Sequence, residues 1–518
     1  MKRIPSFVGL LLLGVATPQL VAGQMLGPSD YVKQAIKASG GADALHNLKR
    51  LAITGKAKHW EPGQSFVAGG EARLLDDSRF TTTWDLEKKM ARTDWDRDMY
   101  YPFPGPKKYS EIVTPTGGVV VSAEPERPMS SIRLAAHLRE LERACPTLLV
   151  EALDSPQSLG QLPDQLLDSE KFPAVTFTSG TTNFTILFDS MTHLPAAIRT
   201  LDDDSAYGDS VYDLVFADWK LIGGVQLAHS LTYKLNGSEI ARIIFTQVVV
   251  NPEIPSHVFE IPDEVRREAE PPATANVPYQ WVIRRLNLAL FTDSDAINYD
   301  AAASKGLRLV ELAPNVQHVV GGTHNGLIVA MKDYVVIFDA PINEWQSRWT
   351  IDAAKAKYPG KRLKYLVLTH HHNDHVGGSR TYIAEGAELI VGSPNKAYME
   401  KVFNATHSVN PDELQKHPKT VKVIEVSEQL SLRDQVEEIR LSKVANPHAE
   451  GMLIGYVVSA NLVWVTDLWV PGRDKIKSLR VVSLSEAIKK LGIAPLRYAG
   501  GHGGVGTNSE LDDIVAQK

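Results

Sequence analysis

The sequence predicts two domains of different fold class: an α+β N-terminal half with a strongly curved, mainly antiparallel sheet, and a layered α/β C-terminal half. The chain has 518 residues, more than one ordinary hydrophobic core accommodates. Short β-prone runs dominate residues 24–265, whereas strands alternate with helices in residues 301–518. Prolines are dense between positions 252 and 272 and cannot sustain a helix or a central strand, so we expect a linker at 266–300.

Residues 1–23 predict a cleaved export signal. Two basic residues precede the short apolar run 8–16, and small residues follow before Gln24, where we place the start of the mature protein. The alternative is a membrane anchor at the N-terminus, but the run is shorter than the roughly 20 residues that a spanning helix needs. Two arginines interrupt the later apolar stretch 281–291. We therefore expect an exported protein, periplasmic or secreted, with no stable membrane insertion.

The composition is typical of a soluble globular protein, with 43% hydrophobic and 22% charged residues. The formal net charge at pH 7 is -6, so the chain lacks the positive charge that gathers phosphates. We expect a small-molecule substrate and no nucleic acid partner. Cys145 is the only cysteine, which excludes an internal disulfide bond. A transition-metal site in this chain must therefore use histidine and carboxylate ligands.

In the N-terminal half, residues 31–51 predict two helical segments separated by the helix-stop pair Gly40-Gly41. Residues 231–235 alternate apolar and polar side chains, as a sheet with one solvated face requires. We expect one or two helices here, including one at 131–143. The predicted strands are 51–54, 79–84, 89–95, 119–122, 175–188, 196–200, 226–235 and 240–250.

The C-terminal half alternates buried strands with helices, which indicates a layered α/β core. The predicted helices are near 347–358, 379–385, 394–403 and 484–491. The predicted strands are 307–312, 326–331, 334–339, 363–369, 389–392, 421–426, 452–459 and 461–466.

A histidine-rich turn follows the buried strand 365–369 and has the sequence His-His-His-Asn-Asp-His-Val-Gly-Gly, residues 370–378. Ligands usually bind at such strand ends in α/β sheets. Residues two apart point the same way on an extended backbone, so His370 and His372 can share one cation. Asp374 and His375 come next and can reach a second position. The glycine pair then allows the backbone to turn tightly.

This segment resembles the H-x-H-x-D-H signature of the metallo-β-lactamase superfamily. The resemblance covers about residues 310–502 and implies an αββα sandwich. It also implies three further metal ligands, each in a loop or at a strand end: His448, Asp467 and His502. Residues 321–325 with the two following strands resemble the opening β-hairpin of the superfamily. For His324 in this segment, a turn role and a place lining the site are both open.

The resemblance implies two metal ions. The first would be bound by His370, His372 and His448, the second by Asp374, His375 and His502, and Asp467 would be shared. We expect zinc, because the ligands are nitrogen and oxygen, although iron or manganese accepts the same set. Asp374 is the candidate catalytic residue, because it would orient a metal-activated hydroxide and pass its proton to the leaving group.

The expected function is an exported metallo-hydrolase of an ester, lactone, thioester or amide, a β-lactam included. The turn at 370–378 resembles that of hydroxyacylglutathione hydrolases, but only 16 residues follow His502, too few for the thioester-binding domain of those enzymes. One alternative is a mononuclear-iron oxidoreductase similar to sulfur dioxygenases. Another is a lipid- or acyl-binding protein with a vestigial metal site, because the N-terminal half weakly resembles lipoprotein-carrier-like domains through Gly40-Gly41 and the strand ending at residues 53–55.

Overall fold

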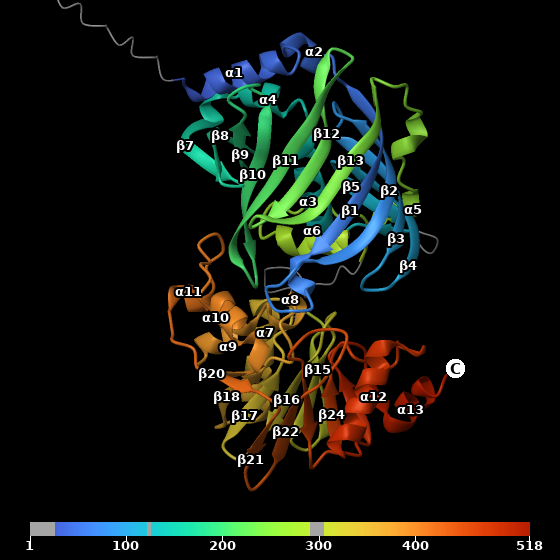
Figure 1. Ribbon diagram of the computed structural model, residues 1–518, viewed down its shortest axis with the longest axis vertical. Helices are drawn as coiled ribbons and strands as arrows, with labels where there is room; N and C mark the ends of the chain where they lie inside the picture. Colours follow the sequence, from blue (N-terminus) through green and yellow to red (C-terminus); the bar gives the residue numbers. More distant parts are fainter. Residues whose placement is uncertain (1–25, 122–125, 291–304) are drawn as a thin grey trace, which may run out of the picture.

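The computed structural model describes residues 26–121, 126–290 and 305–518. The predicted export signal, residues 1–23, lies outside the described residues. Two domains follow one another along the chain, coloured blue to green and yellow to red (Figure 1). Within the described ranges, no helix is both long enough and apolar enough to cross a membrane.

Thirteen strands form one curved antiparallel sheet in the N-terminal domain (Figure 1), in the order β6-β5-β4-β3-β2-β1-β13-β12-β11-β10-β9-β8-β7. β1 joins the two halves of the sheet because it pairs with both β2 and β13. The predicted fold class of this domain is confirmed. The strands are β1 (Arg50–Glu61), β2 (Arg73–Asp85), β3 (Met90–Met99), β4 (Gly105–Thr114), β5 (Gly117–Val121), β6 (Arg127–Pro128), β7 (Leu159–Leu167), β8 (Glu170–Ser179), β9 (Thr182–Phe188), β10 (Pro195–Asp204), β11 (Gly208–Ile222), β12 (Val225–Leu235) and β13 (Ser238–Val250).

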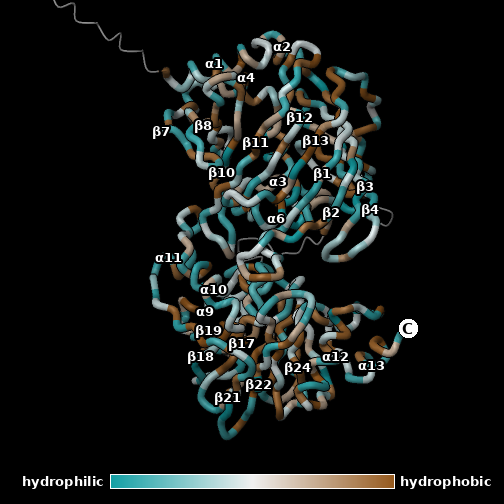
Figure 2. The backbone as a smooth tube through the Cα atoms, viewed as in Figure 1, coloured by the Kyte–Doolittle hydropathy of each residue, from teal (hydrophilic) through white to brown (hydrophobic). Residues whose placement is uncertain are grey.

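Helices cover the inner face of this sheet. β1 alternates buried and more exposed side chains along its length, and hydrophobic and hydrophilic residues are mixed throughout the sheet (Figure 2). The buried side of the sheet packs with Val32, Leu45 and Leu149 from three of the helices in one hydrophobic core. Four α-helices precede β7 in the described residues: three lie at the helical segments predicted within 31–51 and at 131–143, and the fourth, 148–154, was not predicted. They are α1 (Pro28–Ala38), α2 (Ala42–His46), α3 (Ser131–Ala144) and α4 (Leu148–Asp154).

Two sheets pack face to face in the C-terminal domain, in the orders β14-β15-β16-β17-β18-β19-β20 and β21-β22-β23-β24-β25-β26. Phe338, Val367, Leu441 and Trp464 are among the side chains that fill the core between them. The strands are β14 (Arg308–Ala313), β15 (Val316–Val320), β16 (Gly326–Ala330), β17 (Tyr334–Phe338), β18 (Arg362–Val367), β19 (Glu388–Gly392), β20 (Val423–Val426), β21 (Gln429–Arg433), β22 (Glu438–Lys443), β23 (Leu453–Val457), β24 (Leu462–Val465), β25 (Arg497–Gly500) and β26 (Val505–Thr507).

Helices cover both outer faces of this pair of sheets, which completes the αββα sandwich and confirms the predicted fold class. Asn343 begins the first helix by accepting hydrogen bonds from two backbone amides through its side chain. Ser478 caps the helix on the other face in the same way, and Gly492 ends that helix at φ 63°. The helices are α7 (Glu344–Lys357), α8 (Asn373–Val376), α9 (Ser379–Ala384), α10 (Lys396–Phe403), α11 (Glu413–Lys416), α12 (Leu479–Leu491) and α13 (Asn508–Val515).

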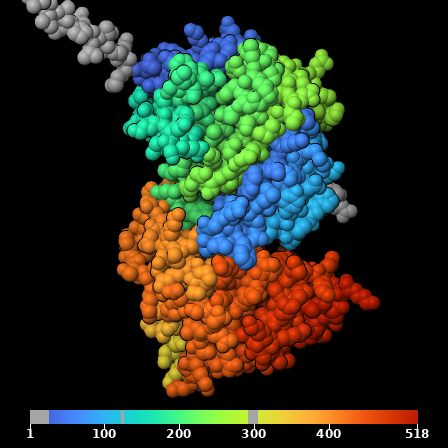
Figure 3. All heavy atoms as spheres, viewed as in Figure 1, coloured from blue at the N-terminus to red at the C-terminus, as the bar shows by residue number. Residues whose placement is uncertain are grey.

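The two domains meet at the end of the sandwich that carries the histidine-rich turn. The predicted linker, 266–300, includes α6 (Tyr279–Asn287), and its last part lies outside the described residues. Arg284 of α6 anchors this helix to the N-terminal domain through buried ion pairs with Glu61 and Asp204. The blue segment that follows β1 also reaches the orange surface of the C-terminal domain (Figure 3). Both segments therefore lie beside the strand ends where we predicted the site.

Candidate metal centre

The histidine-rich turn leads from β18 into α8, and a glycine pair closes it. Gly377 and Gly378 have ordinary backbone angles, with φ of -56° and -98°. A Cβ on Gly377 would lie 2.1 Å from the Ile342 carbonyl oxygen, and a Cβ on Gly378 would lie 1.9 Å from Ser347 Oγ. The pair is therefore needed for close packing behind the site, and the tight turn that we predicted is not its role.

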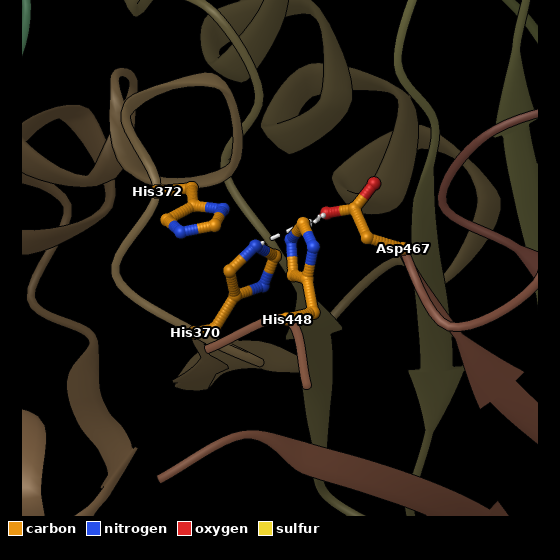
Figure 4. Close-up of side chains that lie close together, drawn as sticks. All are labelled: His370, His372, His448 and Asp467. Atoms are coloured by element: carbon orange, nitrogen blue, oxygen red, sulfur yellow. Dashed lines mark ion pairs between the residues drawn. The ribbon is translucent and has the colours of Figure 1, made fainter. Parts of the chain in front are cut away.

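Four buried side chains form the first group of candidate ligands: His370, His372, His448 and Asp467 (Figure 4). One ligand atom of each lies within 4.8 Å of the other three. His370 Nε2 and His448 Nε2 are both 3.1 Å from Asp467 Oδ2. These two nitrogens and His372 Nδ1 are buried and have no hydrogen-bond partner in the described part of the chain. Such unpaired polar atoms are costly, and a shared cation would satisfy all three.

A second group of candidate ligands adjoins the first through Asp467. His375 Nε2 lies 3.1 Å from Asp467 Oδ2, and His502 Nε2 lies 2.9 Å from Asp467 Oδ1. The two histidine nitrogens are 3.3 Å apart. Asp374 Oδ2 is 4.0 Å from His375 Nε2 and forms an overlapping cluster with His502. The structure thus brings all seven predicted ligands together, with Asp467 common to both groups, and their binding of metal stays a prediction.

His324 is an eighth histidine-or-carboxylate side chain at the site. Its Nε2 donates a hydrogen bond to Asp374 Oδ2 at 3.0 Å, and its ring centroid lies 4.4 Å from that of His502. The structure therefore places His324 beside the second position. Of the two roles that the sequence left open, lining the site and forming a turn, it supports the first. His324 lies in the loop between β15 and β16, where the neighbouring sequence does not distinguish a residue that lines a site from one that forms a turn.

Hydrogen bonds to His370 and His372, and a carboxylate facing His375, indicate the tautomers of these three histidines. Asp339 Oδ2 is 3.4 Å from His375 Nδ1, so that nitrogen carries the proton and Nε2 is free for a metal. The Thr369 hydroxyl donates to Asp339 at 2.8 Å and so accepts from His370 Nδ1 at 3.1 Å. His372 Nε2 donates to the carbonyl oxygen of Ser65 at 3.0 Å, which leaves its Nδ1 free. Each free nitrogen belongs to one of the ligand groups.

Without a bound metal, the surroundings lower the pKa values of His372 and His448 at the first position and raise that of His375 at the second. Burial, reinforced by the neighbouring histidines, holds the pKa of His372 well below its ordinary value. Burial also lowers the pKa of His448, to about 4. Burial alone would raise the pKa of Asp467, but the neighbouring histidines, His375 first, outweigh it and hold that pKa far below its ordinary range. Burial would lower the pKa of His375, yet Asp467 and Asp339 raise it well above the ordinary value.

The N-terminal domain contributes directly to the site through the β1–β2 loop, residues 62–72. Gln64 Nε2 donates to Asp374 Oδ1 at 2.6 Å, and the Ser65 carbonyl accepts from both His371 and His372 at 3.0 Å. The ring of Tyr101 is stacked against that of His448 with centroids 6.4 Å apart. Sequence analysis did not predict these contacts.

Two further buried histidines near the site lie outside the ligand groups. His371 Nε2 donates to the Ser65 carbonyl, and its ring meets the ring of Tyr398 edge-on. His407 Nδ1 is 3.4 Å from Asp203 Oδ1, at the contact between the two domains. Neither belongs to the clusters of possible metal ligands in the described residues.

Residues 321–466 match the family model of the metallo-beta-lactamase superfamily. The C-terminal domain is a metallo-β-lactamase superfamily domain. The predicted family and enzyme class are therefore confirmed, and this domain has the fold of metal-dependent hydrolases. The matched segment includes the turn 370–378 and His448 and ends just before Asp467.

Solved structures with a similar fold include the metallo-beta-lactamases from Pontibacter korlensis and Hirschia baltica, at 16% and 18% sequence identity and TM-scores of 0.31 and 0.32. The similarity covers 40% and 41% of this chain, respectively, and 97% of each of those chains. The metal-soaked Flv1 flavodiiron core from Synechocystis sp. PCC6803 is 15% identical with a TM-score of 0.32, over 40% of this chain and 59% of that chain. No curated protein matched the sequence. The family assignment rests on the family model alone.

Proposed function

We propose that this protein is an exported metal-dependent hydrolase of a small ester, lactone, thioester or amide. The observation that carries the proposal is the convergence of seven nitrogen and oxygen donors from distant parts of the chain. Each of the three histidines at the first position has at least one buried ring nitrogen without a hydrogen-bond partner in the described residues. The donor set fits zinc, which favours histidine and carboxylate ligands, and two groups of ligands suit two ions. Export is proposed from the predicted signal at 1–23, and a small-molecule substrate from the acidic charge balance.

Divalent cations bound here would activate water for attack on a carbonyl group and offset the negative charge that develops on its oxygen. His370, His372 and His448 would hold the first cation, and Asp467 would contact both. Asp374, His375 and His502 would hold the second.

Asp374 is the chain's own candidate for moving the proton. Burial would raise its pKa, but the hydrogen bond from His324 and the charge of His375 hold that pKa well below the ordinary value. Asp374 would therefore be a charged acceptor that orients the attacking water, takes up the proton the water loses on attacking the carbonyl carbon, and passes that proton to the leaving group as its bond breaks.

The alternative of an acyl-binding protein finds little support in the N-terminal domain. An apolar cavity there is lined by side chains that include Trp84, Leu149, Phe216 and Phe245, and its volume is about 70 Å³. An engineered cavity of about 150 Å³ holds one benzene molecule. This one cavity is too small for an acyl chain, and the hydrolase proposal is preferred because the seven nitrogen and oxygen donors converge.

The proposal is tested with full-length protein and chromogenic ester, lactone, thioester and β-lactam substrates, each with and without a chelator. We expect hydrolysis of at least one class, its loss on chelation, and its recovery when zinc is added back. Metal analysis of protein purified without added zinc separates the alternatives. One iron per chain with no hydrolysis of any class would instead favour the oxidoreductase.

A further inference from the structure

The β1–β2 loop approaches the candidate metal centre at Gln64. This side chain is only 3% exposed, and both ends of its amide are hydrogen-bonded within the protein. Its Nε2 donates to Asp374 Oδ1 at 2.6 Å and to Asn373 Oδ1 at 3.1 Å. Its Oε1 accepts from the Tyr101 hydroxyl at 2.5 Å. Because ionised Asp374 can only accept, the NH₂ end of the Gln64 amide must face it.

The loop itself is held in place by contacts that cross between the domains. Arg73 donates from Nε to the Gln64 carbonyl at 2.5 Å and from Nη2 to the His448 carbonyl at 2.8 Å. The Phe66 carbonyl accepts from the Glu450 amide at 2.8 Å. These bonds connect the loop to the backbone beside a candidate ligand, so the position of Gln64 is fixed by the C-terminal domain as well as by its own.

Glycine at position 63 permits this approach. A Cβ there would lie 2.9 Å from Glu61 Oε1 and 3.0 Å from Asn373 Cγ, closer than side chains normally pack. Glu61 also accepts from the Gly63 amide at 2.7 Å. The backbone next to Gln64 therefore lies directly against α8, the helix that carries Asp374 and His375.

We propose that Gln64 is a positioning residue of the metal centre, which orients Asp374 toward the second position while the neighbouring Ser65 carbonyl orients His372 at the first. This proposal rests on the proposed function, because it assumes that the two groups of candidate ligands bind metal ions. Partners of this kind fix the orientation of metal ligands, and their loss typically weakens metal binding about 10–100-fold. The N-terminal domain would thus be part of the catalytic centre.

The test is Gln64→Met, which keeps the size of the side chain and removes its amide. Zinc is withdrawn stepwise from full-length protein by a competing chelator, and the affinities of the two binding steps are compared with those of the unmodified protein. We expect the weaker step to lose about 10–100-fold in affinity and the tighter step to stay unchanged. The turnover number should fall while KM stays, because the proposal has Gln64 act on Asp374 and not on the substrate.

Two further variants keep the test decisive. Tyr101→Phe removes the hydroxyl that holds Gln64 and should weaken the same step by a smaller factor, which covers the case in which Gln64→Met fails to fold. Gln161→Met, at an exposed position on β7, is the matched control. Unchanged zinc affinities in the first two variants, or equal losses at both steps, would overturn the proposal. The zinc affinities are measured without any substrate, so their outcome is independent of the hydrolase test.

A separate observation concerns α6, which covers the centre next to His324. Trp281 and Arg285 lie one helical turn apart and are 3% and 8% exposed. The Arg285 guanidinium stacks on the Trp281 ring at 3.9 Å, and the Trp281 ring meets the His324 ring at 6.4 Å between centroids. Arg285 Nε and Nη2 and Trp281 Nε1 have no hydrogen-bond partner in the described residues. Two buried side chains beside the second position therefore offer unpaired donors.

We infer that Arg285 binds a carboxylate group of the substrate, which narrows the proposed substrate to an anionic ester, lactone, thioester or amide. A guanidinium matches a carboxylate with two parallel hydrogen bonds, which would satisfy the unpaired donors of Arg285. Arg285 is linked to Asp374 by a chain of contacts, because Trp281 lies between Arg285 and His324, and His324 is hydrogen-bonded to Asp374. A bound anion there would lie near the proposed second metal position.

The test compares Arg285→Met with the unmodified protein on two nitrophenyl esters, one with a free terminal carboxylate and one with that group capped as a methyl ester. We expect kcat/KM for the free acid to fall about 10–100-fold through KM, and kcat/KM for the capped ester to change little. Calorimetric titration with phenylacetate and phenylacetamide should show the same contrast without any reaction. Arg79→Ala, on an exposed arginine, is the control. Equal losses for both ligands would overturn the inference, whereas no hydrolysis by the unmodified protein would count against the proposed function alone.

Discussion

Asp467→Ala is expected to abolish hydrolysis, with kcat/KM falling by about 10³-fold or more. Its carboxylate is common to both ligand groups, with Oδ2 3.1 Å from nitrogens of His370, His375 and His448. The other oxygen, Oδ1, lies 2.9 Å from His502 Nε2. Removing this charge weakens both metal positions at once, whereas loss of any one histidine affects mainly one position. Zinc content should fall at both positions, and metal analysis together with steady-state kinetics measures the two effects.

A carboxylate elsewhere on the same domain provides the control. Asp352 is exposed on α7, and Asp352→Ala should keep full zinc content and activity. Asp467→Asn keeps the size of the side chain and should still lose most activity, because the amide lacks the charge that binds the cations. Near-native turnover in either Asp467 variant would show that the cluster is not the catalytic centre.

How much of the site the sequence predicts depends on how local each contact is. The turn 370–378 carries four candidate ligands in a contiguous run, so its chemistry follows from spacing alone. His448, Asp467 and His502 are ordinary loop and strand-end residues, and only their order in the superfamily pointed to them. Gln64 is 310 residues before Asp374 in the chain. No local pattern encodes a contact across that distance, and a glutamine after Pro-Gly is typical of a turn.

The fold shows the same dependence on local pattern. Strands of the sandwich with continuous apolar runs, such as β17 and β24, were predicted closely. β11 was missed because acidic residues interrupt its alternation of apolar and polar side chains. One of them, Asp213, is buried in the sheet and bound by Arg199 at 2.7 Å. A buried aspartate is tolerated in a strand only when a partner such as Arg199 pairs with its charge, and the sequence of the strand itself does not reveal that partner.

Asp339 shows how a residue outside the ligand set can support the whole centre, and Asp339→Ala is expected to cost about 3–5 kcal/mol of the free energy of unfolding. This fully buried carboxylate directly follows β17 and accepts from the Thr369 amide and hydroxyl, both at 2.8 Å. It also accepts from Trp464 Nε1 at 3.2 Å and faces His375 Nδ1 at 3.4 Å. Removing it leaves these buried donors unpaired and frees two candidate ligands to rotate.

The backbone at Asp339 adds to this cost and suggests the matched variant. Its φ is 57°, a left-handed conformation that asparagine and aspartate tolerate better than alanine. Asp339→Asn should therefore destabilise less than Asp339→Ala while still weakening zinc binding, because an amide accepts fewer of these hydrogen bonds than a carboxylate. For a domain of about 200 residues, thermal unfolding should show a midpoint lowered by roughly 6–20 °C in the alanine variant. A native midpoint with native zinc affinity would mean that the ligands are oriented by the metals alone.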